Sequence, residues 1–391
     1  MPYKDFMIRE DVYKVIEKTL QYYYEENVKK NDLNTTKKTD SMQTFYCYSR
    51  LNAIIPRITS NRVMEYIYRD NRITSSIFRK IMMKMYISSV FHMPRLMSEK
   101  TITLPLLPRF SKEVMVYPGN KKIKIFDFDK MTIDNILKDG FSRVWFAKEI
   151  IMREKPKWNF VLPLEKIGEN SYREKLLIGH PFPRLKRKEK IFFTPVVKEY
   201  MEKIKGSGQV QSLDEYCKQL EENINQSIEK INNKIKEEAK DNILKYCKHL
   251  SMLLKSSKGK VNLVFSHGDF QAGNLFLEEE TKKMWLLDWE TWGTRSQHYD
   301  EYNFYYGMRN TNRLIGNIRQ IMFTRGARVG YIDETAVRTR DKLIVYLLED
   351  ALWQIEETAI LPNKAVSNGL RKYINKKTQS IIIKILKKSC G

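Results

Sequence analysis

Cysteine is scarce in this sequence, and its four residues form no motif. They stand far apart over 391 residues, at Cys47, Cys217, Cys247 and Cys390, and no two of them make a C-x-x-C pair. This spacing excludes a disulfide framework and a cysteine-based zinc site. A reducing compartment is therefore the expected environment of the protein.

Long apolar segments are lacking as well. Even the apolar run Ile381–Leu386 is interrupted by Lys384, whereas a membrane-spanning helix needs about 20 consecutive apolar residues. The first residues, Met-Pro-Tyr-Lys-Asp, contain no apolar core of a secretion signal. We therefore expect a cytoplasmic protein.

The sequence also lacks the common glycine-rich phosphate-binding motifs. Gly119 is the only glycine before Lys138, so no G-x-G-x-x-G precedes that lysine. The pattern G-x-x-x-x-G-K-[ST] is missing from the chain as well. The sequence therefore contains no glycine-rich loop that would mark a phosphate-covering segment.

Positive charge, by contrast, is abundant. The 70 Lys and Arg residues outnumber the 47 Asp and Glu residues, which gives a formal net charge of +23. Such a surface attracts phosphates, nucleic acid or anionic lipid, and a solvated lysine-rich surface accounts for it equally well. The densest basic cluster lies within 184–190. No zinc-finger or leucine-zipper pattern accompanies it, so basic patches leave contact with an anionic surface open, and no specific nucleic-acid site is expected.

The first half of the chain divides into two regions. Residues 1–100 have helical spacing over 10–26 and 75–90 and carry no chemical motif, which favours a mostly helical accessory region. Short alternating runs then begin at Thr101 and continue through 101–180. The expected strands of this second region lie at 113–117, 122–128, 132–138, 160–162 and 174–178, and the expected helix lies at 141–154. Strands in quick succession around one helix predict a small α+β lobe with an antiparallel sheet.

Residues 181–391 have the pattern of a larger, mainly helical lobe. The segment 213–254 contains no proline or glycine and is almost continuously helical, as one helix or two, and helical spacing returns beyond Tyr299. Short strands are expected between these helical parts, at 261–265, 275–277 and 284–287. The fold class predicted for the whole chain is α+β.

One segment of this larger region has the spacing of a phosphoryl-transfer loop. Within Ser266–Phe276, Asp269 and Asn274 have the separation of the Asp and Asn in the kinase catalytic loop. Phosphoryl transfer needs a group that accepts or orients the proton of the attacking hydroxyl, and it needs oxygen ligands for magnesium. An Asp and an amide on one tight loop can divide these tasks, and Gly268 and Gly273 would let the backbone turn around them.

A second segment places carboxylates at a strand end. Asp288 and Glu290 follow the apolar run Trp285–Leu287, and magnesium, a hard cation, favours carboxylate ligands. The gap between Asn274 and Asp288 suits two short strands and a turn, which would return Asp288 to the side of Asn274. The order and spacing therefore predict a magnesium site made by Asn274 and Asp288, with Glu290 as a second carboxylate.

The two segments together resemble a known family. The string His-Gly-Asp-x-x-x-x-Asn that starts at His267, followed by Asp-Trp-Glu from Asp288, is similar to the aminoglycoside phosphotransferase and choline kinase superfamily, a branch of the protein-kinase-like fold. The resemblance implies two lobes, a small antiparallel-sheet N-lobe and a larger, mainly helical C-lobe. It also implies a kinase that uses ATP and Mg2+ and has an alcohol group as acceptor. This branch often lacks the glycine-rich loop, and Arg109–Lys112 is the expected phosphate-covering segment.

The same resemblance assigns roles to individual residues. Asp269 would be the catalytic base, and Asn274 and Asp288 would be the magnesium ligands. His267 would support the loop, although chemistry alone also allows it to act as a general base. Asp300 matches an Asp that braces the catalytic loop from the first turn of a helix, and a simple helix cap is the alternative interpretation.

The nucleotide lobe of a kinase supplies a cation for the phosphates, usually a Lys on the third strand paired with a Glu on the next helix. Lys138 and Glu149 are the predicted pair. Lys124 is the competitor for the lysine, and Glu154 is the competitor for the glutamate. Backbone groups of Leu176–Ile178 would bond the adenine edge, because this strand resembles the one that leads into the hinge of such kinases. ATP and GTP both fit these motifs.

Two sets of side chains bear on the acceptor. A helix over 347–357 carries carboxylates and Trp353, which suit a cationic substrate such as an aminoglycoside or choline. Arginines of the same region would suit an anionic sugar, lipid head group or oligosaccharide instead. These arginines are Arg295, Arg309, Arg313, Arg325 and Arg328. A charged helix that faces water accounts for either set.

The leading hypothesis is an ATP- and magnesium-dependent phosphotransferase that acts on a hydroxyl of a small molecule, which is an amino alcohol, an aminoglycoside or a sugar. One alternative is a kinase-like regulatory module that binds nucleotide without transferring a phosphoryl group. Another alternative is a kinase that acts on a cell-envelope saccharide or a lipid head group.

Overall fold

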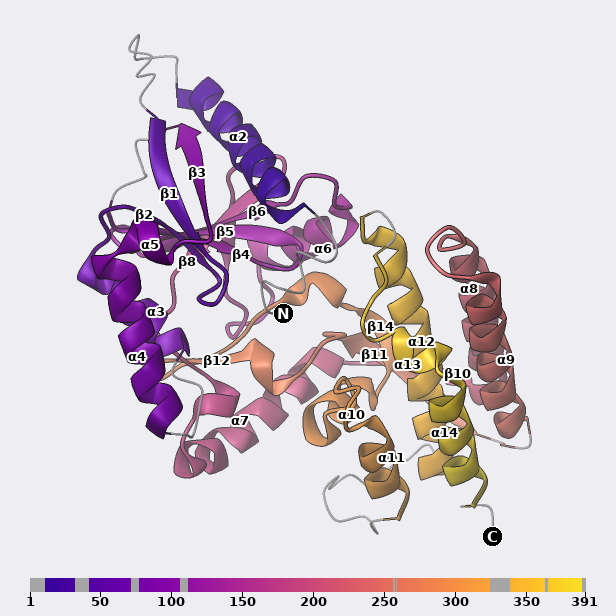
Figure 1. The fold of residues 1–391 in the computed structure, drawn as a ribbon. Helices are drawn as coiled ribbons and strands as arrows, with labels where there is room; N and C mark the ends of the chain where they lie inside the picture. Colours follow the sequence, from indigo (N-terminus) through magenta and orange to yellow (C-terminus); the bar gives the residue numbers. More distant parts are fainter. Residues whose placement is uncertain are drawn as a thin grey trace. The chain divides into compact units, whose positions relative to one another are not determined.

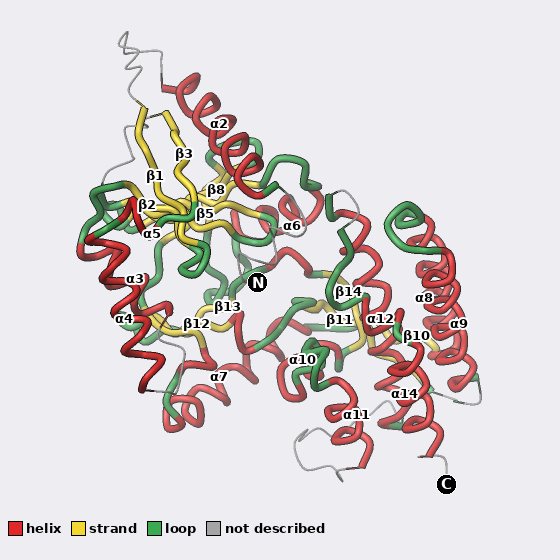
Figure 2. The backbone as a smooth tube through the Cα atoms, in the orientation of Figure 1, coloured by secondary structure: helices red, strands yellow, loops and turns green. Residues whose placement is uncertain are grey.

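The structure, a computed structural model, describes residues 11–31, 42–71, 77–105, 112–255, 257, 259–323, 338–362 and 365–388. The chain forms two compact units, each with its own core (Figures 1 and 2). Unit 1 comprises Met1–His180 and Glu278–Trp285, and unit 2 comprises Pro181–Leu277 and Leu286–Gly391.

Unit 1 is built on an eight-stranded sheet with the order β3-β1-β2-β4-β5-β6-β8-β7. Neighbouring strands pair antiparallel throughout. The strands are β1 (Met42–Tyr48), β2 (Ala53–Pro56), β3 (Lys100–Pro105), β4 (Val114–Pro118), β5 (Lys122–Asp127), β6 (Thr132–Leu137), β7 (Leu164–Lys166) and β8 (Ser171–Lys175). Short turns join β4 to β5 and β5 to β6, which is the connection that antiparallel neighbours allow.

Helices pack on this sheet and form two apolar clusters. The helices of unit 1 are α2 (Val12–Asn31), α3 (Asn61–Asn71), α4 (Ile77–His92), α5 (Pro94–Met97) and α6 (Arg143–Glu154). α2 packs Ile16 and Leu20 with Ile123 and Ile136 of the sheet. α3 and α4 join a second cluster that contains Phe126. Because successive side chains of a strand point to opposite faces, β5 contributes to both clusters.

The first 100 residues contribute strands as well as helices to unit 1. α2 and α4 correspond to the helices expected over 10–26 and 75–90, while β1 and β2 extend the sheet. The expected strands at 113–117, 122–128 and 132–138 are β4, β5 and β6. The strand expected at 160–162 is wrong: these residues are buried, and only Val161 forms an isolated bridge.

Unit 2 is mainly helical. Its helices are α7 (Arg187–Lys205), α8 (Leu213–Glu229), α9 (Glu237–Leu254), α10 (Tyr299–Tyr306), α11 (Leu314–Phe323), α12 (Thr339–Ile360), α13 (Arg371–Ile374) and α14 (Lys376–Lys388). Short 3-10 turns are η1 (Phe182–Arg184), η2 (Ala272–Asn274) and η3 (Trp289–Thr291). The helical segment expected over 213–254 consists of α8 and α9, which lie side by side (Figure 1). α12 runs through the core, with Leu343, Leu347 and Ile355 fully buried.

Two small sheets complete the fold. One has the order β10-β11-β14, formed by β10 (Gln209–Ser212), β11 (Lys260–Ser266) and β14 (Gly293–Ser296), and its pairs are antiparallel. The other has the order β13-β12-β9, formed by β9 (Gly179–Pro181), β12 (Leu275–Glu278) and β13 (Met284–Leu286), where the chain passes from one unit to the other. The predicted α+β class is confirmed.

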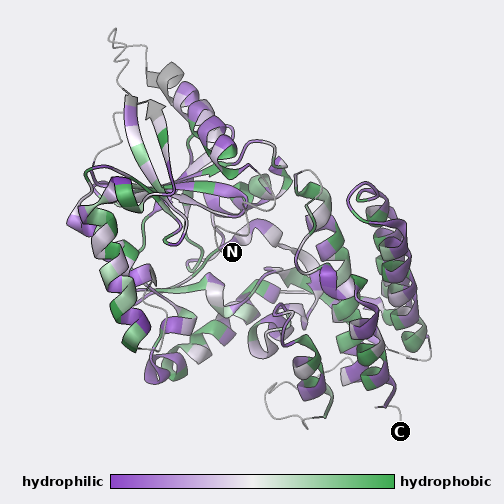
Figure 3. Cartoon of the chain, in the orientation of Figure 1, coloured by the Kyte–Doolittle hydropathy of each residue, from purple (hydrophilic) through white to green (hydrophobic). Residues whose placement is uncertain are grey.

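Polar and apolar residues alternate along the helices of both units (Figure 3). Within the described residues, no helix is both long enough and apolar enough to cross a membrane.

Candidate active site

The predicted catalytic loop follows directly after β11. Ser266 and His267 are buried, and Gly268 has a φ of +82°, in the left-handed region that favours glycine. A Cβ added to Gly268 would lie 2.2 Å from the carbonyl oxygen of Thr291. The loop therefore requires glycine at this position for two independent reasons, its backbone angle and the close approach of Thr291.

Asp300 holds the loop through its backbone. Its Oδ2 accepts a hydrogen bond from the His267 N–H at 2.8 Å, and its Oδ1 accepts one from the Gly268 N–H at 3.1 Å. Asp300 lies in the first turn of α10, at the place where the family resemblance puts the bracing Asp. Two charge-assisted hydrogen bonds to consecutive amides orient the loop more strongly than neutral ones would.

The His267 ring is held in one neutral tautomer. Its Nδ1 faces the Asp269 N–H at 3.2 Å, and its Nε2 faces the carbonyl oxygen of Leu287 at 3.0 Å. An amide N–H only donates and a carbonyl oxygen only accepts, so Nδ1 is the acceptor and Nε2 carries the proton. Burial lowers the pKa of His267, although Asp300 and Asp269 oppose this effect. Both ring nitrogens are therefore occupied, which suits a supporting role and leaves no free nitrogen for a base.

Asp269 and Asn274 contact each other directly. Asn274 Nδ2 donates to the backbone oxygen of Asp269 at 2.8 Å and to Asp269 Oδ2 at 3.0 Å. Gln271 Nε2 donates to the same Oδ2 at 3.0 Å. The side chain of Asp269 is 18% exposed. Its Oδ1 accepts no hydrogen bond from the described part of the chain and has Arg309 Nε at 3.5 Å as its ion-pair partner, so this oxygen can still accept a proton from a hydroxyl.

The hairpin predicted to return Asp288 towards Asn274 is present. β12 and β13 are neighbours, and the N–H of Leu287 donates to the carbonyl oxygen of Asn274 at 2.8 Å. Asp288 has a φ of 64° and a ψ of 58°, which is the left-handed conformation. A non-glycine residue in this region is strained by roughly 1–3 kcal/mol, and such strain clusters at functional sites. Glu290 follows within η3.

The donor set fits a magnesium ion. Both acceptors of Asn274 Nδ2 are oxygens of Asp269, so the orientation of the amide is determined and its Oδ1 is the remaining polar atom. Among the described residues, nothing donates to that Oδ1. An amide oxygen and the carboxylates of Asp288 and Glu290 are the hard oxygen ligands that magnesium prefers.

Arg309 lies against the loop and was expected only as one of several arginines near an acceptor. Its Nη2 donates to the Gly268 carbonyl oxygen and approaches the Tyr299 hydroxyl at 3.4 Å. Its Nε lies 3.5 Å from Asp269 Oδ1. Arg325 and Arg328 lie outside the described residues, as does Arg109–Ser111 of the expected phosphate-covering segment. The sequence spacing does not reveal that Arg309, 40 positions after Asp269, reaches this carboxylate.

Unit 1 contains a buried polar cluster on the α6 side of its sheet. The Glu149 carboxylate forms ion pairs with Lys122 and with Arg153, the latter at 2.7 Å. Arg153 also pairs with Glu174 of β8, which accepts a hydrogen bond from Asn135 of β6. Burial alone would raise the pKa of Glu149, but the charges of Lys122 and Arg153 outweigh it and hold that pKa well below its usual range.

The lysine that contacts Glu149 is therefore Lys122, where the spacing had indicated Lys138 or Lys124. Lys122 pairs with Leu137 across the β5–β6 ladder, so Lys138, one residue further on, belongs to the opposite face of the sheet. Lys138 is buried, with its Nζ 5.7 Å from the centre of the Phe141 ring. Of the two glutamates considered, Glu149 is buried and Glu154 is exposed. A nucleotide role for Lys138 remains a prediction.

The segment predicted to bond adenine follows β8. Leu176 is buried, and its N–H donates to the carbonyl oxygen of Met131 at 2.8 Å. The carbonyl oxygen of Ile178 accepts a hydrogen bond from the Glu279 N–H at 2.9 Å. These two groups are occupied within unit 1, so an adenine contact, which remains a prediction, would use other backbone groups of 176–178.

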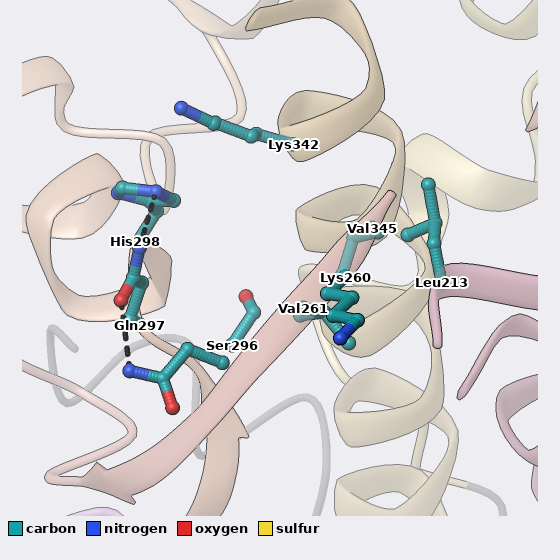
Figure 4. A pocket seen from close by; sticks show the side chains of 9 residues that line it. Leu213, Lys260, Val261, Ser296, Gln297, His298, Lys342 and Val345 are labelled. Carbon is teal, nitrogen blue, oxygen red and sulfur yellow. Dashed lines mark hydrogen bonds between the residues drawn. The ribbon is translucent and has the colours of Figure 1, made fainter. Parts of the chain in front are cut away.

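A small pocket in unit 2 lies away from this loop (Figure 4). It lies at the start of β11, around Val261, and is lined by Ser296, Gln297 and Lys342. The predicted catalytic loop follows the other end of the same strand, roughly 20 Å away at about 3.3 Å per residue. Gln297 is held there by Asn262 at 3.1 Å and faces His298 at 3.2 Å. The pocket is separate from the candidate catalytic residues.

Comparisons with known proteins agree with these features. The family model of choline/ethanolamine kinase matches residues 183–311, which include the catalytic loop, Asp288 and Asp300. Among curated protein sequences, none matches this chain significantly. This family match confirms the resemblance to the choline kinase and aminoglycoside phosphotransferase superfamily.

Solved structures of choline/ethanolamine kinases and aminoglycoside phosphotransferases are similar to this chain at low identity and low TM-score. A choline/ethanolamine kinase family protein from Mesorhizobium loti is 14% identical, with 72% of this chain and 96% of that chain covered and a TM-score of 0.42. A thermostable mutant of an aminoglycoside phosphotransferase is 11% identical, with 71% and 91% covered and a TM-score of 0.43. An ethanolamine kinase from Plasmodium vivax is 13% identical, with 84% and 94% covered and a TM-score of 0.41. At these scores, the chemistry must be argued from the residues of the site.

The chain is accordingly a phosphotransferase of the kinase class with a hydroxyl group as acceptor. More particularly, residues 183–311 are similar to choline/ethanolamine kinases.

Proposed function

We propose that this protein transfers the γ-phosphoryl group of ATP to a hydroxyl of a small molecule in a magnesium-dependent reaction. The observation that carries the proposal is the state of the Asp269 carboxylate. Gln271 and Asn274 hold its Oδ2, and its Oδ1 accepts no hydrogen bond from the residues described. A carboxylate held by one oxygen and open at the other is suited to accept the proton of an attacking hydroxyl.

The chemistry then follows from this geometry. The acceptor oxygen attacks the γ-phosphorus, and its proton passes to Asp269 Oδ1. The bond between the γ-phosphorus and the bridging oxygen breaks, and ADP leaves with the electron pair. His267 and Asp300 keep the loop in position while the charge on Asp269 changes, because neither has a free group to offer to the substrate.

The oxygen ligands for magnesium would be Asn274 Oδ1 and the Asp288 carboxylate, with Glu290 as a further carboxylate. Magnesium bound by these residues would neutralise charge on the phosphates. Asn274 connects the proposed magnesium site to the proposed base Asp269, because its Nδ2 donates to Asp269 while its Oδ1 remains available as a metal ligand. Loss of Asn274 should therefore disturb both metal binding and the orientation of Asp269.

Lys122 is our candidate for the cation that meets the nucleotide phosphates. A Lys paired with a Glu on the following helix is the arrangement used by kinases, and Lys122 with Glu149 has it. Arg153 holds the other oxygen of Glu149, so this carboxylate keeps its place when Lys122 turns towards a phosphate. We propose ATP as the nucleotide.

The acceptor classes to test first are amino alcohols and sugars, since the similar proteins are named as choline, ethanolamine and aminoglycoside kinases. Asp269→Asn should lower acceptor-dependent ADP release about 100- to 10,000-fold, the usual contribution of a positioned base. Asp214→Asn is the matched control, because Asp214 is an exposed residue of α8 and loses the same charge. Unchanged turnover in Asp269→Asn would exclude the proposed role of Asp269.

A further inference from the structure

The carboxylates of α12, which suggested a cationic acceptor, are used inside unit 2. Glu349 is buried and accepts hydrogen bonds from the Ser296 N–H at 2.6 Å, the Ser296 hydroxyl at 2.7 Å and the Tyr216 hydroxyl at 2.6 Å. Asp350 is fully buried and forms an ion pair with Lys372 at 2.5 Å and a hydrogen bond with the Tyr373 hydroxyl. Both Glu349 oxygens and Asp350 Oδ2 are therefore occupied inside unit 2, and the remaining Asp350 Oδ1 is buried without a hydrogen-bond partner, with the ammonium group of Lys372 already paired to the same carboxylate.

The aromatic residue of α12 is also occupied. The guanidinium of Arg309 lies over the ring of Trp353, with Cζ 3.6 Å from the ring centre. A quaternary or primary ammonium group would need this ring face for a cation–π contact. The protein's own cation already has that position, so a cationic substrate could use this face of Trp353 only by displacing Arg309.

The Arg309 guanidinium lies beside the proposed catalytic base, and not all of its N–H groups are hydrogen-bonded. Nη2 is bonded to the Gly268 carbonyl oxygen, while the buried Nε makes no hydrogen bond and is ion-paired with Asp269 Oδ1 at 3.5 Å. Nη1 has no partner among the described residues, and the side chain is 11% exposed. A planar guanidinium whose Nη1 remains open is a group that matches a carboxylate or phosphate well.

From these contacts we propose that the acceptor is an anionic alcohol, whose carboxylate or phosphate group binds Arg309 while its hydroxyl meets Asp269. The proposal rests on the phosphotransferase function proposed above and names its substrate class. The 3.5 Å between Arg309 Nε and Asp269 Oδ1 requires that the anion and the hydroxyl be close together in the acceptor. A hydroxy acid, a sugar acid or a phosphorylated polyol has this arrangement.

Arg309 has one competing role, a contact with the phosphoryl group in transfer. The two roles differ in what they do to acceptors. An arginine that meets the transferred group would affect every acceptor alike, whereas an arginine that binds the acceptor anion would discriminate a charged acceptor from its neutral isostere.

The test compares each acid with its neutral counterpart. Acceptor-dependent ADP release is measured with glycerate and glyceramide, gluconate and gluconamide, and glycerol 3-phosphate and glycerol, with choline and ethanolamine as cationic acceptors. We expect kcat/KM to favour at least one anion over its neutral partner about 10- to 100-fold, the effect of one charge-assisted hydrogen bond. Arg309→Gln should remove this preference through KM, and Arg309→Lys should restore part of it. Arg319→Gln, which changes an exposed arginine of α11, should leave the preference intact.

Binding is measured in parallel by calorimetry with the Asp269→Asn variant, so that affinity does not depend on turnover. Preferred turnover of choline or ethanolamine would overturn the anionic acceptor and leave the phosphotransferase function standing. Equal losses of kcat for acid and amide in Arg309→Gln would also overturn it. Equal affinity of the Asp269→Asn variant for acids and for amides would overturn the anionic acceptor even where no turnover is detected. Tighter binding of acids with no ADP release would support the Arg309 site and count against the proposed transfer instead.

Discussion

Lys122 and Glu149 form a buried ion pair in unit 1, with side chains 11% and 1% exposed. The two residues come from different elements, since Lys122 begins β5 and Glu149 lies in the middle of α6. The pair therefore depends on the packing of α6 against the sheet, and on Arg153, which shares the Glu149 carboxylate. A cation held in this way can be tested for its part in nucleotide binding.

Lys122→Met should raise the KM for ATP about 10- to 100-fold, because it removes one charge-assisted contact to the phosphates. Stability should fall by about 1–3 kcal/mol, since Glu149 stays buried with Arg153 as its remaining charged partner. Steady-state kinetics and urea unfolding measure the two effects. Lys138→Met is the comparison variant. If the KM for ATP rises more in Lys138→Met than in Lys122→Met, the phosphate contact belongs to Lys138.

Gly268→Ala should destabilise unit 2 and abolish most activity. The added Cβ would meet the Thr291 carbonyl oxygen at 2.2 Å, and the φ of +82° is unfavourable for any L-residue. Backbone strain alone costs about 1–3 kcal/mol. Thermal unfolding and ADP release are the measurements.

Gly273→Ala, in the same loop, supplies the control for this change. A Cβ at Gly273 has no atom within 4 Å among its surroundings, and the residue has no positive φ. It should therefore fold with a stability close to that of the parent chain. Equal melting temperatures for the two alanine variants would refute the steric argument.

Asp300→Asn should lower kcat about 10- to 100-fold while changing the melting temperature less than Gly268→Ala does. The carboxylate accepts from two N–H groups, one on each oxygen, and an amide can accept only through its single oxygen. One N–H of the loop would then face an NH2 group, and the loop would shift. If the folded variant has an unchanged kcat, Asp300 acts only as a helix cap.

Much of unit 2 could be predicted because its signals are local in sequence. The proposed catalytic loop, the β12–β13 hairpin and the Asp300 brace all lie within about 40 consecutive residues, and their spacing follows from strand and turn geometry. The sequence does not identify Lys122 as the partner of Glu149, because strand alternation decides which lysine faces α6, and the register of β5 against β6 is not readable from either strand alone.

Arg309 shows a second limit of the sequence. Its contact with Asp269 depends on how the segment after α10 folds back onto the loop, and its stacking partner Trp353 lies on a helix more than 40 positions later. Likewise, Glu349 and Asp350 have the sequence pattern of a cation site, but tertiary packing buries them against Tyr216 and Lys372. Side chains recruited by long-range packing carry no local signal.

Stability should depend on pH through His267. Burial lowers its pKa in the folded chain, so on acidification the unfolded chain takes up a proton first. The stabilisation is fully present above the ordinary pKa of histidine, near 6.5, and is lost as pH falls below it, by at most about 1.4 kcal/mol per pH unit. Urea unfolding at a series of pH values from 7.5 to about 5 measures this slope. His267→Asn should flatten it, His92→Gln on the surface of α4 should not, and identical slopes in all three chains would show that His267 is not the titrating group.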